Sequence, residues 1–345
     1  MKVGDDVFIA LSFLSGIVVI FGVLLNGLVC ITFVKYRCLL QGGHTLVFSM
    51  AITDLLCSAV AVPMSFMANV KKKWLFKETG CTINAFLVTW CGLLSITHLA
   101  ALAYSRYEAI SLRQNKLTVN KKVIGVVFAL WLYTFVFAIA PVAGWSRYSL
   151  EGIRTSCSVD WKSPGVGAIS YTACLFCGCF ALPIAVILFS YFKFYKALKK
   201  MTRKSSNTWG YRSALAKRTA EIEKKMAKIF LVMIAAFLVA WCPYAAVSLI
   251  SVCGKSSWLN PLSEVIPAYL AKLSFVYNPV LYFLMYKRFR RKAICLFLYS
   301  REQTLTSDTS KYLTTDKAEG KPRYLLKEKG DSLHKSRNSR ENETL

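Results

Sequence analysis

Seven long apolar runs constrain the fold of this chain more than any other feature. Residues 7–34 contain no charged side chain, and the same holds for four further runs: 79–105, 123–145, 163–192 and 229–254. Two more runs carry a single charge each, Asp54 within 45–70 and Lys272 within 265–286. About 20 apolar residues are enough for a helix to cross the hydrocarbon core of a bilayer. The sequence therefore predicts an all-α membrane protein, a bundle of seven transmembrane helices in a lipid bilayer.

Composition excludes several other classes of protein. The 345 residues are 55% hydrophobic, yet they carry a net charge of +26. The charges lie outside the apolar runs instead of being spread along the chain, as they would be in a soluble domain. This excludes a disordered chain, a secreted disulfide-rich domain and a DNA-binding domain, so no nucleic-acid partner is expected.

The positions of Lys and Arg predict how the bundle is oriented. They cluster after the third run, between the fifth and sixth, and after the seventh, which all lie on one side if the runs alternate. Cytoplasmic loops carry an excess of Lys and Arg. We therefore expect a multi-pass plasma-membrane protein with an extracellular N-terminus and a cytoplasmic C-terminus. Four lysines on the outer side oppose this orientation: Lys71, Lys72, Lys73 and Lys77.

The same pattern divides the chain into four parts. We expect residues 1–6 to be an extracellular N-terminus and residues 7–287 to be the bundle. Apolar and basic residues alternate over 288–299, which predicts a short amphipathic cytoplasmic helix. Cys295 in this helix is equally consistent with palmitoylation and with a plain interfacial cysteine. Residues 300–345 are polar and mixed in charge, which predicts a disordered cytoplasmic tail with Ser and Thr residues within reach of a kinase.

Two of the twelve cysteines differ from the rest in their surroundings. Cys81 opens the third run at its outer end, and Cys157 lies in the outer loop after the fourth run. Both would meet the oxidising side, which predicts a disulfide that ties this loop over the bundle. Cys174, Cys177 and Cys179 resemble metal-ligand spacing, but they lie within an apolar run and have no second pair nearby. Packing is the better interpretation, and no metal is expected.

Lys272 is the most informative residue in the chain. It lies near the middle of the seventh run, where a lysine costs roughly 2.5–3.5 kcal/mol. A lone buried amine tends to lose its proton, and a neutral amine is the form that condenses with an aldehyde. The alternative is a structural lysine paired with a carboxylate. The candidate acids are Asp54, Glu264, which is about 12 Å away along the helix axis, and Glu151 in the outer loop.

Short motifs in five of the runs resemble those of the rhodopsin-like G-protein-coupled receptors. They are Asn26, Asp54, Ser105-Arg106-Tyr107, Trp241-Cys242-Pro243-Tyr244 and Asn278-Pro279-Val280-Leu281-Tyr282. Within that family, two segments resemble the animal opsins: Ile266-Pro267-Ala268-Tyr269-Leu270-Ala271-Lys272, and the outer loop Gly144-Trp145-Ser146-Arg147-Tyr148 followed by Glu151-Gly152 and Cys157. The resemblance runs from about residue 7 to residue 297. It is weakest to the vertebrate visual pigments and stronger to non-visual or invertebrate opsins such as those of cnidarians.

The resemblance implies a role for each matching residue. Lys272 would carry retinal as a Schiff base, 11-cis in the dark and all-trans after light, in a pocket lined by Trp241, Tyr244 and Phe237. Arg106 would bind the helix-six side at rest, with Glu223 as its partner, and the G protein in the active state. The other implied switch residues are Asn26, Asp54, Tyr191, Asn278, Pro279 and Tyr282.

Three positions depart from the family pattern. Asn84 stands where vertebrate visual opsins have a glutamate counterion, which leaves Glu151, at the position of the alternative counterion in many invertebrate and non-visual opsins. Ser105 replaces the usual acid before Arg106, so a change in dark activity or coupling is expected. The triplet Tyr286-Lys287-Arg288 matches no group-specific triplet of the opsins.

The resemblance implies a light-activated receptor and not an enzyme. Photoisomerisation would strain the pocket near Trp241, helix six would swing out about Pro243, and the cytoplasmic face would open to a heterotrimeric G protein. A receptor kinase and arrestin would act on the tail. One alternative is a retinal photoisomerase of the retinochrome type, which Ser105 and the unusual triplet leave open. A less favoured alternative is a receptor for a diffusible ligand, in which Lys272 forms no Schiff base.

Overall fold

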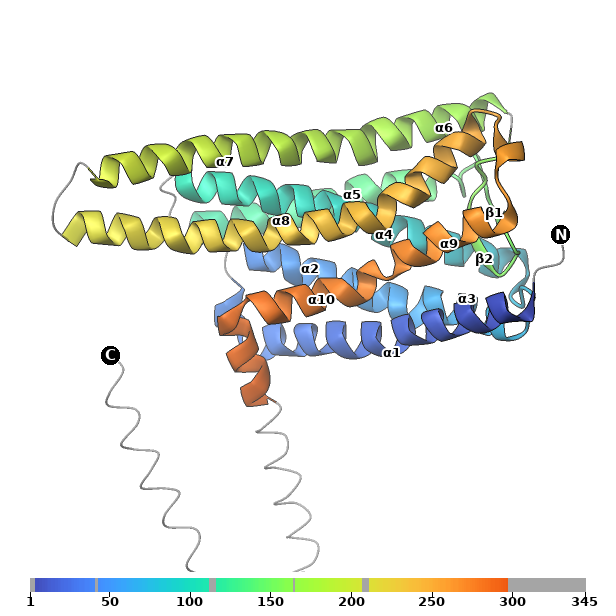
Figure 1. Cartoon of the computed structure of the whole chain (residues 1–345), viewed down its shortest axis with the longest axis horizontal. Coiled ribbons are helices and arrows are strands. Elements are labelled where there is room, and N and C mark those ends of the chain that lie inside the picture. The colour runs from blue at the N-terminus through green and yellow to red at the C-terminus, as the bar shows by residue number, and fades with distance from the viewer. Residues whose placement is uncertain (1–3, 41–42, 112–115, 164, 207–210, 297–345) are drawn as a thin grey trace, which may run out of the picture. The chain divides into compact units, whose positions relative to one another are not determined.

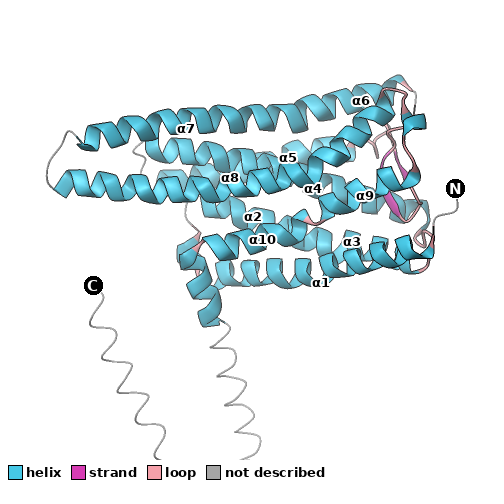
Figure 2. Ribbon diagram, viewed as in Figure 1, coloured by secondary structure: helices cyan, strands magenta, loops and turns pink. Residues whose placement is uncertain are grey.

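Helices make up nearly all of the regular structure (Figure 2). The computed structural model describes residues 4–40, 43–111, 116–163, 165–206 and 211–296. The described helices form seven spans that lie side by side as a bundle (Figure 1). In chain order these are α1 (Asp5–Lys35), α2 with α3 (Gly43–Leu56, Val62–Val70), α4 (Lys77–Ser111), α5 (Lys116–Ile139), α6 with α7 (Val166–Phe176, Leu182–Ser206), α8 (Tyr211–Val252) and α9 with α10 (Pro261–Lys272, Ser274–Met285). The predicted seven-helix fold is confirmed.

The seventh span differs from the others because it is broken in the middle. Six spans contain helices long and apolar enough to cross a membrane by themselves. The seventh is divided between α9 and α10 at Leu273, whose N–H donates to the Leu270 carbonyl at 3.1 Å in a tightened turn. The hydroxyl of Ser274 donates to the Ala271 carbonyl at 2.7 Å. Lys272 is therefore the last residue of a helix that ends inside the bundle.

Prolines account for other departures from regular helix. Spans two and five pass through π-helical turns at Cys57–Ala61 and Cys177–Ala181, each closely followed by a proline, Pro63 or Pro183. A proline lacks an N–H and crowds the preceding turn, so the helix widens there. The fourth run was predicted to continue to residue 145, but α5 ends at Ile139, because Pro141 disfavours helical backbone in the residue before it.

A β-hairpin covers one end of the bundle, the end at which α1 begins (Figure 1). Strands β1 (Tyr148–Glu151) and β2 (Ser156–Val159) pair antiparallel, with Glu151 opposite Ser156. A disulfide joins Cys157 of β2 to Cys81 of α4, which confirms the predicted bond. The turn needs Gly152, which has a positive φ of 51° and lies so close to α9 that a Cβ would be 2.2 Å from Val265.

The compact unit that contains the bundle ends at Ala293. Residues 287–296 are helical, against a predicted helix over 288–299. Phe289 and Ala293 are buried, whereas the basic side chains of this helix are exposed: Lys287, Arg288, Arg291 and Lys292. The predicted tail at 300–345 lies outside the described residues.

The cysteines of the fifth span do not share one environment. Cys179 is buried, as the packing interpretation expects. Cys174 and Cys177 are exposed on the bundle surface, so packing inside the bundle is wrong for these two.

Candidate functional site

Lys272 lies inside the bundle, with only 4% of its surface exposed. Its Nζ lies 4.3 Å from the centre of the Tyr269 ring, one helical turn earlier in α9. That ring is held in place because the Asn69 amide of α3 donates to the Tyr269 hydroxyl at 2.7 Å. Among the described residues, no hydrogen bond or ion pair is formed by the amine itself. A buried primary amine without such a partner is costly, and it is suited to covalent attachment.

Glu151 is the acid that the fold brings to this lysine. It is half-buried at the end of β1, and it lines the same cavity as Lys272, together with Val88, Ala268 and Ala271. Burial raises the pKa of Glu151 from its ordinary 4.5 to about 7. The charge of Lys272 opposes that rise, and so do the hydroxyls of Ser158 and Tyr244. The predicted juxtaposition of Glu151 and Lys272 is therefore present, but as a shared cavity and not as a direct ion pair.

A second, apolar cavity continues from this one toward the fifth span. Five residues line both cavities: Val88, Cys157, Ser158, Trp241 and Tyr244. The apolar cavity is further lined by Leu93, Ile96, Leu175 and Phe180, among others. Elongated ligands with few polar atoms bind in cavities of this kind. The site thus consists of an apolar cavity and an adjoining smaller cavity that is lined by an amine and a carboxyl group.

Aromatic side chains of α8 form one wall of the apolar cavity. Phe237 and Trp241 stack with ring centres 5.4 Å apart, and Tyr244 meets Trp241 edge-on. All three line the cavity, as predicted from the sequence. Gly92 of α4 lets the indole approach, because a Cβ at this position would lie 2.2 Å from the Trp241 ring. Trp241 also donates to the Ser274 hydroxyl at 3.4 Å, which links the cavity wall to the break in the seventh span.

Asn84 has a different environment from the predicted one. It is fully buried in α4, and its amide donates to the Ala61 carbonyl of the π turn at 2.7 Å. It does not line either of these two cavities of the described residues. Its side chain therefore closes the widened turn of span two. Any contribution to the retinal site remains a prediction.

A small cavity lies among the predicted switch residues deeper in the bundle. Asn278 donates to the Asp54 carboxylate at 3.1 Å, and Ser95 donates to the other carboxylate oxygen at 3.5 Å. Asn26 bridges α1 to α10 through the Phe275 carbonyl at 2.8 Å. Asn26, Asp54, Asn278, Pro279 and Tyr282 together line this cavity.

At the opposite end of the bundle from the hairpin, Arg106 lies against α8. Its guanidinium is 5.4 Å from the centre of the Phe230 ring, and two of its nitrogens lie 3.4 Å from the Ser105 hydroxyl. Tyr191 of α7 donates to the Ala227 carbonyl of α8 at 3.0 Å, which ties these two helices. The side chain of Glu223 lies outside the part that the structure describes, so its pairing with Arg106 remains a prediction.

Several residues that shape the site were not predicted. Tyr269 lies three residues before Lys272, so helical spacing alone would have placed it beside the amine. Trp161 lies in an irregular loop, where no periodicity signals its position, yet it donates to the Tyr244 hydroxyl at 3.2 Å. His44 pairs with the Tyr282 hydroxyl at 3.3 Å, a contact between residues 238 positions apart that no local pattern indicates.

Comparison with known proteins agrees with this geometry. The family model "7 transmembrane receptor (rhodopsin family)" matches residues 25–282. Parapinopsin of Ictalurus punctatus is 32% identical over 312 residues, which cover 88% of each chain. Melanopsin of Phodopus sungorus is 33% identical over 78% of this chain, and melanopsin-B of Xenopus laevis is 32% identical over the same share. The chain spans only 58% and 51% of the lengths of these two melanopsins.

A solved structure matches as well. The crystal structure of squid rhodopsin superposes with a TM-score of 0.81 at 28% sequence identity, over 87% of this chain and 88% of that one. The family model covers well over half of the sequence, and the match to parapinopsin covers 88% of this chain. The chain belongs to the rhodopsin family of seven-transmembrane receptors and, within it, to the opsins.

Proposed function

We propose that this chain is a light-sensing receptor of the plasma membrane that holds retinal on Lys272 and activates a heterotrimeric G protein. One observation carries the proposal: a buried amine and a carboxyl group line one cavity, and this cavity adjoins a larger apolar one. Retinal joined to the Lys272 nitrogen as a Schiff base, 11-cis in the dark, would supply the absorption of light and a change of shape.

The residues around Lys272 fit this ligand. Glu151 would stabilise a positive charge on the Lys272 nitrogen, since it lines the same cavity and an opposite charge favours the charged form. The Asn69 amide fixes the Tyr269 ring beside the amine. Flat apolar walls for the ligand come from Phe237, Trp241 and Tyr244. The space kept open by Gly92 would be lost if that residue carried a side chain.

A route for the signal starts at Trp241. Its hydrogen bond to Ser274 joins α8 to the break between α9 and α10, so movement of the indole acts on both helices. Pro243 lies inside α8 and lets this helix bend. Three contacts farther from the hairpin would change when α8 moves outward. They are the Asp54–Asn278 hydrogen bond, the Arg106–Phe230 contact and the Tyr191–Ala227 hydrogen bond. A receptor kinase and arrestin would then act on the tail.

These switch contacts favour the receptor over the photoisomerase alternative. An isomerase needs the cavity and the lysine but has no need of a bond between Asp54 and Asn278, or of an arginine against α8. Glu151 lines the Lys272 cavity, and its carboxylate would stabilise a protonated Schiff base. This favours a covalently bound ligand over a diffusible neutral one.

An absorption spectrum tests the proposal directly. The purified protein is incubated with 11-cis retinal and measured in the dark and after a flash, and light-dependent nucleotide exchange on a G protein is measured in parallel. We expect a retinal-dependent band that shifts on illumination, and exchange that rises with light. Lys272→Ala should abolish the band, whereas Lys255→Ala, at an exposed lysine, should keep it. A folded protein without a band would contradict retinal binding, and a band without exchange would favour the photoisomerase.

A further inference from the structure

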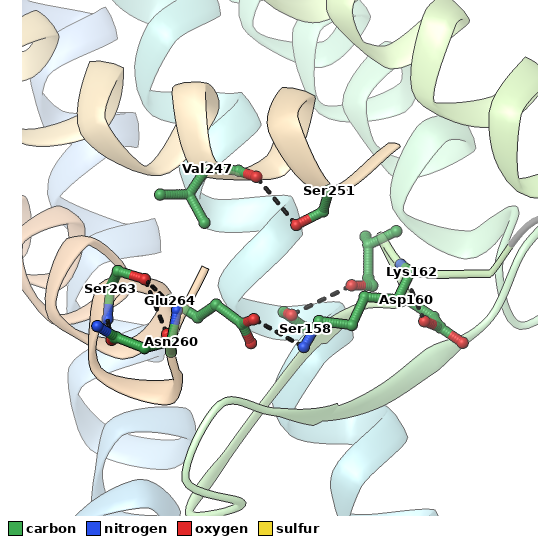
Figure 3. A network of polar contacts seen from close by, with 9 residues as sticks. Ser158, Asp160, Lys162, Val247, Ser251, Asn260, Ser263 and Glu264 are labelled. Carbon is green, nitrogen blue, oxygen red and sulfur yellow. Dashed lines mark hydrogen bonds and ion pairs between the residues drawn. The ribbon is translucent and has the colours of Figure 1, made fainter. Parts of the chain in front are cut away.

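A polar pocket lies between the β-hairpin and the outer ends of α8 and α9. Figure 3 shows its side chains converging from these three parts of the chain. It is lined by carboxyl, amine and hydroxyl groups, among them Glu151, Ser158, Asp160, Lys162, Ser251 and Glu264. None of the signalling steps above uses this pocket.

This pocket adjoins the Lys272 cavity. Glu151 and Ser158 line both of them. Glu151 therefore has the attachment lysine on one side and a polar, solvent-suited space on the other. A water molecule in such a space would find several hydrogen-bonding partners.

An ion pair forms part of the lining of the polar pocket. Lys162 Nζ lies 2.7 Å from the Glu264 carboxylate, and the two residues come from different elements, the segment after β2 and the first turn of α9 (Figure 3). The Lys162 side chain is 54% exposed while that of Glu264 is 7% exposed, so the pair stands between solvent and interior.

The neighbours of the pair hold it in position. The Lys162 backbone N–H donates to Asp160 at 3.2 Å, and Arg147 pairs with the same carboxylate at 2.6 Å. On the α9 side, Asn260 and Ser263 form a reciprocal capping pair that fixes the turn carrying Glu264. Both partners are thus anchored by their own segments.

We propose that the polar pocket is the route by which water and small solutes reach the Lys272 nitrogen, that the Lys162–Glu264 ion pair closes its mouth, and that Glu264 is a positioning residue which acts through Glu151. This inference rests on the function proposed above. If Lys272 carries retinal, the ion pair would control proton exchange and hydrolysis at the Lys272 nitrogen. Its test needs only the protein.

Titratable and charged groups face Glu151 from three parts of the chain. The titratable or charged groups that face it are Lys272, Glu264 and Tyr269 from α9, Tyr244 from α8, and Asp160 and Lys162 from the segment after β2. Glu264 raises the pKa of Glu151, because a like charge disfavours the carboxylate. Lys162 neutralises Glu264 in the ion pair, so each partner controls how strongly the other acts on Glu151.

The first experiment measures access to Lys272 in the protein without retinal. Reductive methylation with formaldehyde and cyanoborohydride is followed at Lys272 by peptide mass spectrometry. We expect Lys162→Met and Glu264→Gln each to accelerate methylation several-fold, because each opens the mouth. Exchanging the partners, Lys162→Glu with Glu264→Lys, rebuilds the pair and should restore the slow rate. Lys72→Met is the matched control. It removes another exposed lysine that forms an ion pair, with Asp5 at 2.7 Å, and neither residue of that pair lines these cavities.

The second experiment measures the protonation of Glu151 in the same variants. The infrared carboxyl band of Glu151, assigned with Glu151→Gln, is titrated against pH. Lys162→Met leaves the negative charge of Glu264 unbalanced and should raise the midpoint by about one unit, and Glu264→Gln leaves the positive charge of Lys162 and should lower it by a similar amount. The double variant Lys162→Met/Glu264→Gln should return the midpoint toward that of the wild type while methylation stays fast.

The proposed route is wrong if Lys272 is methylated at the same rate in all folded variants. The action of Glu264 through Glu151 is wrong if the Glu151 titration midpoint is the same in Lys162→Met and Glu264→Gln. An intact Cys81–Cys157 bond and an unchanged thermal transition show that a variant is folded. A protein that binds no retinal but shows gated methylation would contradict the proposed function and leave this inference standing. A protein that binds retinal but shows the same methylation rate in all variants would support the proposed function and overturn this inference.

Discussion

At the scale of single residues, the site depends on where one carboxyl group is placed. Asn84 is occupied with the Ala61 carbonyl, and Asp54 bonds to Asn278 and Ser95 farther along the bundle. Glu264 is paired with Lys162. This leaves Glu151 as the acid that lines the Lys272 cavity, and two predictions follow from its position.

Glu151→Gln should lower the affinity of the Lys272 nitrogen for a proton. The amide carries no charge, so the charged form of the nitrogen loses its electrostatic stabilisation. We expect the retinal-loaded variant to absorb in the ultraviolet at neutral pH, as measured by its absorption spectrum between pH 5 and pH 9. Glu151→Asp keeps the charge and should retain a visible band. An unchanged band in Glu151→Gln would assign the stabilising role to Asn84 with water or an anion.

Glu151 should also make the stability of the ligand-free protein depend on pH. Burial raises its folded-state pKa to about 7 from an ordinary 4.5, so between these values the folded state binds more protons than the unfolded state. The free energy of unfolding therefore falls as the pH rises through this window. We expect the melting temperature of the wild type to drop by a few degrees more than that of Glu151→Gln between pH 4.5 and pH 7.5. Parallel curves for the two proteins would show that Glu151 titrates normally.

At the scale of helices and strands, close approach of α4 to α8 gives the cavity its wall. Gly92→Ala would push a methyl group into the Trp241 ring, since a Cβ there lies 2.2 Å from it. Overpacking of this kind costs about 1–3 kcal/mol. We expect a lower melting temperature and a shifted absorption band, because Trp241 must move into the cavity. Gly125→Ala is the control, because a Cβ at this position of α5 meets no atom within 4 Å. Equal melting temperatures for the two variants would contradict the tight contact.

The elements also show where sequence patterns succeed and where they fail. The seven spans could be predicted because each run offers about 20 predominantly apolar residues, the length that a helix needs to cross a bilayer with its backbone hydrogen bonds satisfied internally. The break at Leu273 could not, since Ser274 and its neighbours read as ordinary helix formers and the turn is held by long-range contacts such as the Trp241–Ser274 bond. The end of α5 at Ile139 was missed because the run remains apolar after the chain stops being helical at Pro141.

At the scale of the whole molecule, the site depends on segments that are far apart in the sequence. Lys272 and Glu151 could be proposed as partners because the outer loop was expected to be tied over the bundle, and the disulfide does tie it. The ion pair between Lys162 and Glu264 and the contact of His44 with Tyr282 join segments without a shared pattern. Contacts of this kind arise from the packing of the complete fold, and a local sequence window contains no signal for them.

The balance between the resting and active bundle should depend on Ser105. The Arg106 guanidinium lies 3.4 Å from the Ser105 hydroxyl, too long for a strong bond, so Ser105→Glu would provide a carboxylate at close range. A hydrogen bond to a charged partner is worth about 1.5–3 kcal/mol, and 1.4 kcal/mol corresponds to a tenfold change in an equilibrium. We expect the variant to lower nucleotide exchange in the dark by about tenfold while keeping its light response. Ser105→Ala, which removes the hydroxyl without adding charge, should leave dark exchange unchanged or slightly higher. A Ser105→Glu protein as active in the dark as the wild type would show that other contacts of Arg106 set the resting state.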